Sequence, residues 1–389
     1  MNLNFPTGLC AERFLAEYWQ QRPLLIRNAL PGYTSPLDGD ELAGLALEES
    51  IESRLVLERD GSRPWQAEYG PFDAARFERL PSSHWTLLIQ DIEKHLPEVG
   101  ELLDAFAFLP RWRLDDIMIS YAADRGSVGP HVDDYDVFLV QAAGHRRWQI
   151  EETGRSEAEY IPDLDLRILP DFDPTQEWLL SPGDLLYLPP HIPHWGLAEG
   201  NGCITCSVGY QAPRLDMMAL DWCDQTIQRQ VPAVRYRDIP LRPQHDSAEI
   251  DAEVLSALHA DLLGYLQQDP VAFARWFGCH VSEAKAHLQI EPAAVPLDRE
   301  QFMAEWRMQG SIERNGWSKF LFFPATDERC YLFVSGQAFS LPLQRRSTIA
   351  LLCSARQLVY SSCMHRFSDQ ESQELLCSLH NEGHLQFLT

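Results

Sequence analysis

One histidine and one aspartate are spaced so that they could bind a metal ion together. His131 and Asp133 are two residues apart in the segment Gly129-Pro-His-Val-Asp-Asp-Tyr-Asp. Because side chains alternate between the two faces of an extended strand, this spacing places an imidazole and a carboxylate on the same face. A lone pair of this kind is common by chance and is usually a surface feature. The interpretation as a metal site therefore depends on a third ligand from elsewhere in the chain.

A second histidine that could complete the site follows a tight turn and a short apolar run. The segment Ser181-Pro-Gly-Asp-Leu-Leu-Tyr-Leu-Pro-Pro-His-Ile-Pro-His contains His194, the preferred ligand, and His191, the alternative in the proline-rich bend. Two imidazoles and one carboxylate leave three positions of an octahedron open, which suits a non-haem Fe(II) ion that binds a co-substrate and dioxygen. A structural zinc ion would instead be enclosed by four protein ligands.

The elements around these residues are short β-type runs. Apolar and β-branched runs are separated by glycine, proline and aspartate, and they follow a helix at 11–21 and a strand at 23–27. The clearest runs are Ile117–Tyr121, Val137–Val140, Arg147–Ile150, Leu185–Leu188 and Ile204–Tyr210. Short strands without long helices between them predict an antiparallel barrel or sandwich up to about residue 210.

The hydrophobic period changes after about Arg214. Three segments with apolar residues at helical spacing follow, at 215–229, 252–267 and 271–288, and a proline-containing stretch at 290–296 indicates a linker. Beyond it we expect a compact mixed α/β module. Its predicted elements are a helix at 299–308, strands at 319–323 and 330–335, helices at 347–353 and 369–380, and a last strand at Leu385–Leu388.

The charge of the chain favours a basic partner. Its 389 residues include 32 Lys and Arg against 57 Asp and Glu, a formal net charge of −25. Such a surface repels the phosphate backbone, so naked nucleic acid is not expected as a partner. A cationic protein would be attracted instead. The strongly acidic segment 151–177 is a candidate rim for such a partner.

The cysteines and the apolar runs indicate a cytoplasmic protein. The nine cysteines are scattered and odd in number, which does not fit a secreted disulfide framework. The N-terminal segment lacks a basic region followed by an apolar one, and no apolar run approaches the roughly 18 residues that span a bilayer. We therefore expect no export, no membrane and a reducing compartment.

Six segments together carry a specific resemblance. In chain order they are Tyr18-Trp-Gln-Gln-Arg-Pro-Leu-Leu-Ile-Arg, Asp115-Asp-Ile-Met-Ile-Ser-Tyr, Gly129-Pro-His-Val-Asp-Asp-Tyr-Asp-Val-Phe, Gly144-His-Arg-Arg-Trp, Pro182-Gly-Asp-Leu-Leu-Tyr-Leu-Pro-Pro and Ser207-Val-Gly-Tyr. Their order and spacing resemble the Jumonji C (JmjC) cupin family of Fe(II)- and 2-oxoglutarate-dependent oxygenases. Within that family, the chain is most similar to the bacterial ribosomal oxygenase branch.

The resemblance implies a fold, a domain order and an activity. The fold is a mainly β catalytic domain, a double-stranded β-helix of the cupin type, at 1–210. A helical dimerisation region at 211–290 and a winged-helix-like α+β module at 291–389 follow, and the protein is expected to be a homodimer. The implied reaction adds a hydroxyl to the β-carbon of an arginine in large-subunit ribosomal protein L sixteen, with Fe(II), 2-oxoglutarate and dioxygen.

The resemblance also assigns the main site residues. His131, Asp133 and His194 correspond to the iron ligands, and Arg146 corresponds to the cation that binds the distal carboxylate of 2-oxoglutarate. A buried dicarboxylate suits a planar and permanently charged guanidinium. Strand alternation agrees, because it separates Arg146 from the neighbouring Arg147 and leaves only one of them facing inward.

Three hydroxyl residues are further candidates in the same pattern. Ser120 is placed near the same carboxylate, although a serine that satisfies a strand edge is an equal alternative. Thr205 and Ser207, on the last strand of the barrel, are weaker candidates for polar contacts near the iron.

The substrate side of the site is less defined. An arginine substrate requires carboxylates and an aromatic wall, and Asp124, Asp134, Tyr135 and Asp136 cluster near the motif. For any single one of them, a role in bracing the strand is favoured. The chain departs from the branch at Asp134, where a glutamine-type residue is expected, and in the loop 123–127, so substrate preference is the least secure expectation.

Several functions are compatible with these residues. An iron-dependent protein hydroxylase is the leading hypothesis, and hydroxylation of a histidine or N-methyl demethylation would use the same chemistry. A non-catalytic metal-stabilised cupin scaffold and a small-molecule oxygenase are the other classes. An anion-binding arginine beside open coordination positions argues against a scaffold, and the long C-terminal half favours a macromolecular substrate.

Overall fold

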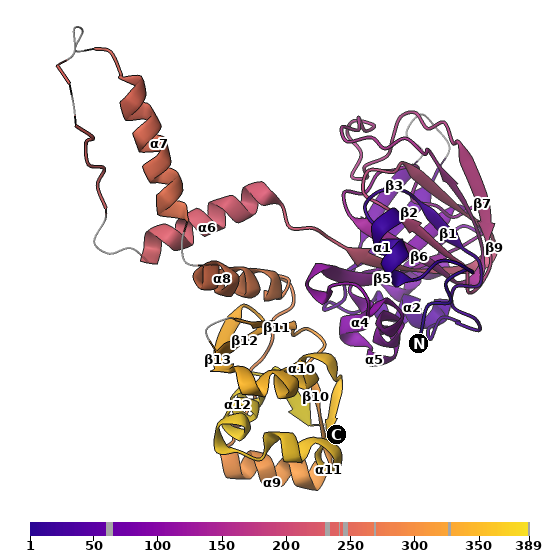
Figure 1. Cartoon of the computed structure of the whole chain (residues 1–389). Helices are drawn as coiled ribbons and strands as arrows, with labels where there is room; N and C mark the ends of the chain where they lie inside the picture. Colours follow the sequence, from indigo (N-terminus) through magenta and orange to yellow (C-terminus); the bar gives the residue numbers. More distant parts are fainter. Residues whose placement is uncertain are drawn as a thin grey trace. The chain divides into compact units, whose positions relative to one another are not determined.

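The computed structural model describes residues 1–59, 65–229, 234–240, 242–243, 248–267, 270–325 and 328–387. The chain divides into two compact units, Met1–Ala212 and Pro213–Thr389. The first unit contains the large β-sheet, and the second contains helices and smaller sheets (Figure 1). The division lies beside Arg214, where the hydrophobic period changes. The three-domain division with a boundary near residue 290 stays a prediction.

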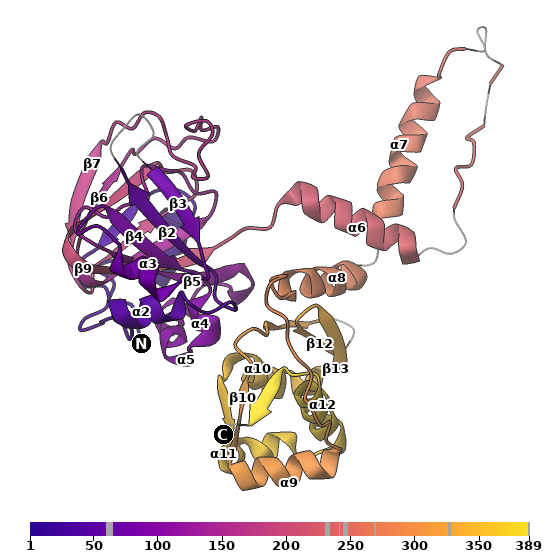
Figure 2. The same ribbon diagram turned by 180° about the vertical axis from the view of Figure 1, so that it is seen from behind.

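An antiparallel sheet forms the first unit. Its path is β1-β8-β6-β9-β5-β4-β2-β3, with β7 paired to β6, and every pairing is antiparallel as the sequence predicts (Figures 1 and 2). The strands are β1 (Leu24–Ile26), β2 (Ser53–Glu58), β3 (Trp65–Tyr69), β4 (Trp85–Ile89), β5 (Leu114–Ala122), β6 (Asp136–Ile150), β7 (Gln176–Leu180), β8 (Leu185–Leu188) and β9 (His194–Tyr210).

Two strands are longer than the sequence predicts. The runs 137–140 and 147–150 belong to one strand, β6, and the run 204–210 is only the end of β9. The pairing of β6 with β9 is irregular in the middle, where Gly144 has a φ of +60°. A Cβ at Gly144 would lie 2.9 Å from the Cα of Cys203, so glycine permits this close approach. The glycine therefore marks a bulge within β6 and not a turn between strands.

Short helices precede and interrupt the sheet. They are α1 (Ala11–Glu17), α2 (Gly39–Leu45), α3 (Ala74–Glu78), α4 (Ile92–His95) and α5 (Pro97–Gly100). The predicted helix at 11–21 is too long, because the chain leaves α1 at Tyr18. This exit allows Trp19 to stack on Phe138 and Tyr187 in the core, with ring centroids 6.2 and 5.9 Å away.

Three helices begin the second unit: α6 (Leu215–Arg229), α7 (Ala252–Leu266) and α8 (Pro270–Ser282). The first two agree closely with the predicted ranges, but α8 ends well before the predicted residue 288. Its last residue, Ser282, is buried and donates its hydroxyl to the Cys279 carbonyl oxygen at 3.0 Å. The same hydroxyl accepts from the Gly336 N–H at 3.0 Å, which anchors the end of the helix.

The rest of the second unit is the predicted mixed α/β module. In its described part, two three-stranded sheets have the orders β14-β10-β15 and β11-β12-β13. The elements are α9 (Arg299–Gln309), β10 (Ser311–Arg314), β11 (Phe320–Pro324), β12 (Arg329–Val334), β13 (Gln337–Pro342), α10 (Arg346–Ser354), β14 (Gln357–Val359), α11 (Tyr360–Cys363), α12 (Gln370–Asn381) and β15 (Leu385–Phe387). The sequence analysis missed β10, β13 and β14. Leu388, the predicted end of the last strand, lies outside the described residues.

All nine cysteines lie in described ranges, and all are free thiols. Among the helices that the structure describes, none has both the length and the apolar character needed to cross a membrane.

Candidate metal centre and adjoining pocket

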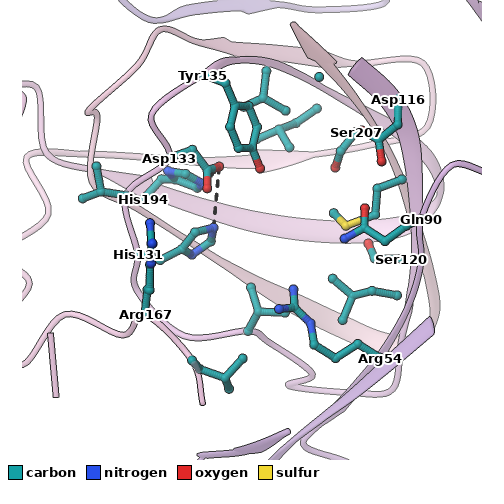
Figure 3. Close-up of a pocket in the computed structure, with 18 of the residues that line it drawn as sticks. Arg54, Gln90, Asp116, Ser120, His131, Asp133, Tyr135, Arg167, His194 and Ser207 are labelled. Carbon is teal, nitrogen blue, oxygen red and sulfur yellow. Dashed lines mark ion pairs between the residues drawn. The ribbon is translucent and has the colours of Figure 1, made fainter. Parts of the chain in front are cut away.

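His131, Asp133 and His194 come together where β9 begins. His131 forms an isolated antiparallel bridge with His194, in which each backbone N–H donates to the carbonyl oxygen of the other residue at 3.0 Å. The Oδ2 atom of Asp133 lies 3.9 Å from Nε2 of His131 and 3.5 Å from Nε2 of His194 (Figure 3). The strand expected at His131 is reduced to this bridge. The imidazole and the carboxylate nevertheless lie side by side.

Backbone carbonyls fix the orientation of both imidazoles. The Nδ1 atom of His131 lies 2.9 Å from the Gly129 carbonyl oxygen, and that of His194 lies 2.9 Å from the Ile192 carbonyl oxygen. Because a carbonyl oxygen only accepts, each Nδ1 carries a proton and donates it, which leaves the lone pair of each Nε2 for a metal. Burial, assisted by the neighbouring His131, lowers the pKa of His194 to about 4. This donor set fits a divalent transition metal with open positions.

His191, the alternative ligand, lies outside this group of three. It has a φ of +70° in the bend between β8 and β9. Its N–H donates to the Asp133 carbonyl oxygen at 2.7 Å, and its own carbonyl oxygen accepts from the Arg155 N–H at 2.8 Å. The contacts of His191 therefore support the backbone beside the site, and it is His194 that the structure brings to Asp133.

The three residues line a cavity of about 420 Å³ in the first unit. They lie on one side of it, and Gln90, Asp116, Ser120 and Ser207 lie on the facing wall (Figure 3). The cavity is also lined by Arg54, Met118, Asp134, Tyr135, Arg146, Trp148 and Gly209.

Arg146 provides a buried positive charge in this cavity. Its side chain is almost fully buried, with the guanidinium carbon 5.7 Å from the centre of the Trp148 ring. Its Nε donates to the Cys203 sulfur at 3.5 Å, but its buried Nη2 has no hydrogen-bond partner among the described residues. A buried donor without an acceptor is costly, so the site fits an anionic group that approaches this nitrogen.

The neighbouring Arg147 faces outward, as strand alternation predicts. It forms ion pairs with Glu177 of β7 and Glu199 of β9, at a position that is about one-third exposed. Arg146 is therefore the one of the two arginines that lines the cavity.

The three hydroxyl candidates differ in their positions. Ser120 and Ser207 line the cavity together with Arg146. Ser120 also donates to the Thr205 carbonyl oxygen at 3.4 Å, so the strand-edge contact expected as its alternative role is present. The Thr205 hydroxyl donates to Oε1 of Gln141 at 3.1 Å, away from the cavity lining.

The acidic residues near the motif separate into two groups. Asp134 and Tyr135 line the cavity. Asp136 is fully buried and braces the strand, because it accepts from Nη2 of Arg113 at 3.0 Å and from the Tyr187 hydroxyl at 2.6 Å. Asp124 accepts from the N–H of Gly200 in β9 at 2.8 Å and is not among the cavity-lining residues.

Several lining residues had no role predicted from the sequence, and two of them carry charge that matters for the pocket. Asp116, at the start of β5, presents its carboxylate on the wall near Ser207 (Figure 3). Arg54, on β2, points into the cavity, and within the described ranges its buried Nε has no hydrogen-bond partner. The signal for Asp116 was its position directly before the run 117–121. No signal marked Arg54, because β2 itself was not predicted.

Two family models match the chain. The JmjC domain matches residues 101–218, and the ROXA-like winged helix matches residues 265–386. The predicted fold class is thereby confirmed, with a cupin-like, sheet-rich domain followed by helices and a winged-helix module.

Known proteins are similar over most or nearly all of the chain. The ribosomal protein uL16 3-hydroxylase of Escherichia coli (strain K12) is 31% identical over 384 residues, which cover 99% of this chain and 98% of that protein. A probable ribosomal oxygenase of Haemophilus influenzae is 34% identical over 77% of this chain and 76% of its own length.

Solved structures have the same fold as this chain. The X-ray structure of E. coli YcfD has a TM-score of 0.88 at 30% identity, with both chains covered completely. A structure of the same ribosomal oxygenase in complex with cobalt and 2-oxoglutarate has a TM-score of 0.84 at 30% identity, covering 100% of this chain and 99% of that one. By these similarities along its full length, the chain belongs to the family of JmjC-domain ribosomal oxygenases that carry a ROXA-like winged helix.

Proposed function

We propose that this protein is an Fe(II)- and 2-oxoglutarate-dependent dioxygenase that hydroxylates the β-carbon of an arginine in ribosomal protein uL16, the large-subunit protein L sixteen. One observation carries the proposal. One pocket holds two histidines and one carboxylate as a donor set, together with a buried guanidinium whose Nη2 has no acceptor among the residues that the structure describes. The E. coli relative, named as a ribosomal protein uL16 3-hydroxylase, supports the same reaction.

Different residues of the pocket would bind the metal and the co-substrate. His131, Asp133 and His194 would hold Fe(II), and Arg146 would bind the distal carboxylate of 2-oxoglutarate with support from Ser120. When bound, the iron supplies the activation of dioxygen that is coupled to oxidation of 2-oxoglutarate to succinate and carbon dioxide. The protein's own part is to keep both imidazoles oriented, neutralise the dicarboxylate and hold the reacting C–H bond in place.

The substrate arginine is assigned to the part of the cavity lined by Asp116, Met118 and Tyr135. A guanidinium is recognised by a carboxylate acceptor and by an aromatic or apolar surface for its stem. Burial raises the pKa of Tyr135, so its hydroxyl stays protonated at neutral pH and adds no further negative charge. These residues thus offer the acceptor that an arginine needs in the same cavity as the metal ligands.

The overall charge suits a basic substrate protein. The net charge of −25 attracts a cationic ribosomal protein and disfavours naked nucleic acid. Turnover should therefore fall as added salt screens this attraction. The nine free thiols support a reducing, cytoplasmic location.

We also propose that the protein is a homodimer that associates through α6 and α7. Both helices expose large apolar side chains, each between 42% and 81% exposed: Leu215, Met217, Leu220 and Ile227 on α6, and Leu255, Leu258, Leu262 and Leu263 on α7. Apolar surface of this extent is rarely left open to water, and a second copy offers the same surface in return. Light scattering should give the mass of two chains for the wild type and of one chain for Leu220→Glu. A monomeric wild type would exclude the dimer.

The activity is tested with purified uL16, Fe(II), 2-oxoglutarate and air. We expect one added oxygen on uL16, a matching amount of succinate, and neither product with His131→Ala. An oxygen added to a histidine of uL16 would show that the hydroxylated residue is a histidine and not an arginine. Turnover stimulated by free amino acids and not by uL16 would indicate a small-molecule oxygenase. No succinate with any ribosomal protein would leave the scaffold as the better account.

A further inference from the structure

The start of β5 contains a bulge directly at the pocket. Leu114 pairs with Tyr210 of β9 and Ile117 pairs with Val208, so Asp115 and Asp116 together stand opposite the single residue between those partners. Bulges of this kind re-aim a side chain, and they occur next to functional sites. The residue that is re-aimed here is Asp116, whose carboxylate faces the cavity (Figure 3).

The β9 strand lies close to this carboxylate. Gly209 is the residue opposite the bulge, and a Cβ built on it would lie 3.3 Å from Oδ1 of Asp116. The carboxylate therefore has little freedom on that side. Its position must be held from the other side of β5, where the partner strand is β4 and the short helix α4 follows it.

Side chains of α4 bond the backbone on both sides of the bulge. Glu93 Oε2 accepts from the Ile117 N–H at 2.8 Å, and Lys94 Nζ donates to the Asp115 carbonyl oxygen at 3.0 Å. The N–H of Asp91, just before α4, donates to Oδ2 of Asp116 at a long 3.4 Å. Two side chains thus fix the residues that flank Asp116, and a backbone group contacts its carboxylate directly.

These side chains are buried and carry charge. Lys94 forms ion pairs with Asp91 and with Glu93, and all three side chains are less than 10% exposed. Burial raises the pKa of Glu93 to about 7, Lys94 opposes this rise, and Asp116 and Asp91 add to it. A buried ionic group adds little net stability compared with apolar packing, so stability alone does not account for these side chains.

We propose that Glu93 and Lys94 are positioning residues for substrate recognition, which hold the bulge so that the Asp116 carboxylate faces the guanidinium of the substrate arginine. The inference rests on the proposed function, because it takes the substrate side chain to be an arginine. It extends that function to two residues that belong neither to the three metal ligands nor to the cavity lining.

Glu93→Met and Glu93→Gln form the matched pair for the test. Methionine fills similar space but cannot accept from the Ile117 N–H, whereas glutamine still can. The substrates are a uL16 peptide centred on the hydroxylated arginine and the same peptide with citrulline, which has no positive charge. With Glu93→Met we expect the KM for the arginine peptide to rise about tenfold, the value of one lost hydrogen bond. We expect the KM for 2-oxoglutarate to stay unchanged and the preference for arginine over citrulline to fall.

Two further variants separate positioning from general damage. Glu93→Gln should restore most of the wild-type KM. In an Asp116→Asn background, Glu93→Met should raise the KM no further, because both changes act on the same contact. Lys94→Met, which removes the donor to the Asp115 carbonyl oxygen, should repeat the Glu93→Met pattern and replaces that variant if it does not fold.

The outcomes are distinguishable. Wild-type KM and wild-type preference for arginine in both Glu93→Met and Lys94→Met would overturn the inference. An equal rise in the KM for 2-oxoglutarate, or a full effect in the Asp116→Asn background, would also overturn it, because both indicate damage that does not pass through Asp116. A wild-type enzyme that leaves the arginine peptide unmodified would instead refute the proposed function, before any variant is compared.

Discussion

Replacing Arg146 with methionine tests how the pocket binds its co-substrate. Arg146 is almost fully buried, and its Nη2 has no acceptor in the described part of the protein. A bound carboxylate would supply that acceptor through charge-assisted hydrogen bonds worth roughly 1.5–3 kcal/mol each. Two such bonds are worth about 3–6 kcal/mol, which is a factor of about 10²–10⁴ in affinity. Methionine keeps the apolar contact with Trp148 but removes every donor.

The assay is succinate release at increasing 2-oxoglutarate concentration, with saturating Fe(II) and uL16. We expect the KM for 2-oxoglutarate to rise by about 10²–10⁴ in Arg146→Met. The matched control is Arg147→Met, one residue further along the same strand. Its ion pairs with Glu177 and Glu199 are at the surface, where such pairs are worth about 0–1 kcal/mol, so its KM should change less than about fivefold.

A KM within about threefold of wild type for Arg146→Met would refute this reasoning, because no lost ionic hydrogen bond has so small a value. An equal loss in Arg147→Met would refute it as well. Arg54 also lines the cavity, and its buried Nε has no hydrogen-bond partner among the described residues. If the large rise in KM appears in Arg54→Met and not in Arg146→Met, Arg54 is the residue that binds 2-oxoglutarate.

Three further predictions concern stability and the metal. Burial raises the pKa of Glu93 to about 7 from 4.5, so the stability contributed by this group is fully present below pH 4.5 and lost as the pH rises through 7. The free energy of unfolding in urea should rise for Glu93→Gln relative to wild type by up to about 3 kcal/mol between pH 4.5 and pH 8. A difference between the two proteins that does not change with pH would contradict the burial of a charge at this position. Arg113→Met leaves the buried Asp136 carboxylate without its ion-pair partner at 3.0 Å and should cost about 3–5 kcal/mol in the same assay, whereas a loss below about 1 kcal/mol would show that the pair is not desolvated. Co(II) at about 100 times its Kd should stabilise the wild type by about 2.7 kcal/mol and leave the melting temperature of His194→Ala unchanged, and equal stabilisation of both would place the metal elsewhere.

The sequence predicted the parts of the pocket that depend on local periodicity. Alternation along a strand separates Arg146 from Arg147, as the structure shows in β6. His131 also lies beside Asp133 as predicted, although the expected strand is reduced there to an isolated bridge. His194 was preferred over His191, which lies in the proline-rich bend, and it is His194 that the structure brings to Asp133. The bend that turns His191 away depends on a left-handed backbone conformation that its residue type does not reveal.

The missed features depend on irregular pairing between distant strands. The residue types at 114–117 do not predict a bulge, because the bulge is defined only by the pairing of β5 with β9. Asp116 therefore could not be assigned to the pocket from its spacing. The runs 137–140 and 147–150 were predicted as separate for a related reason, since a glycine in a bulge and a glycine in a turn look alike in sequence. Helix ends such as Ser282 are likewise set by tertiary contacts.

Hydroxylation of an arginine of uL16 with dioxygen is the reaction that this pocket should perform. It is tested by fragment mass analysis of uL16 after reaction with Fe(II), 2-oxoglutarate and isotopically labelled dioxygen, with His131→Ala as the control. We expect one labelled oxygen on the β-carbon of one arginine with the wild type, and none with the variant. Labelled oxygen on another residue type, or an unmodified uL16 while 2-oxoglutarate is consumed, would contradict this expectation.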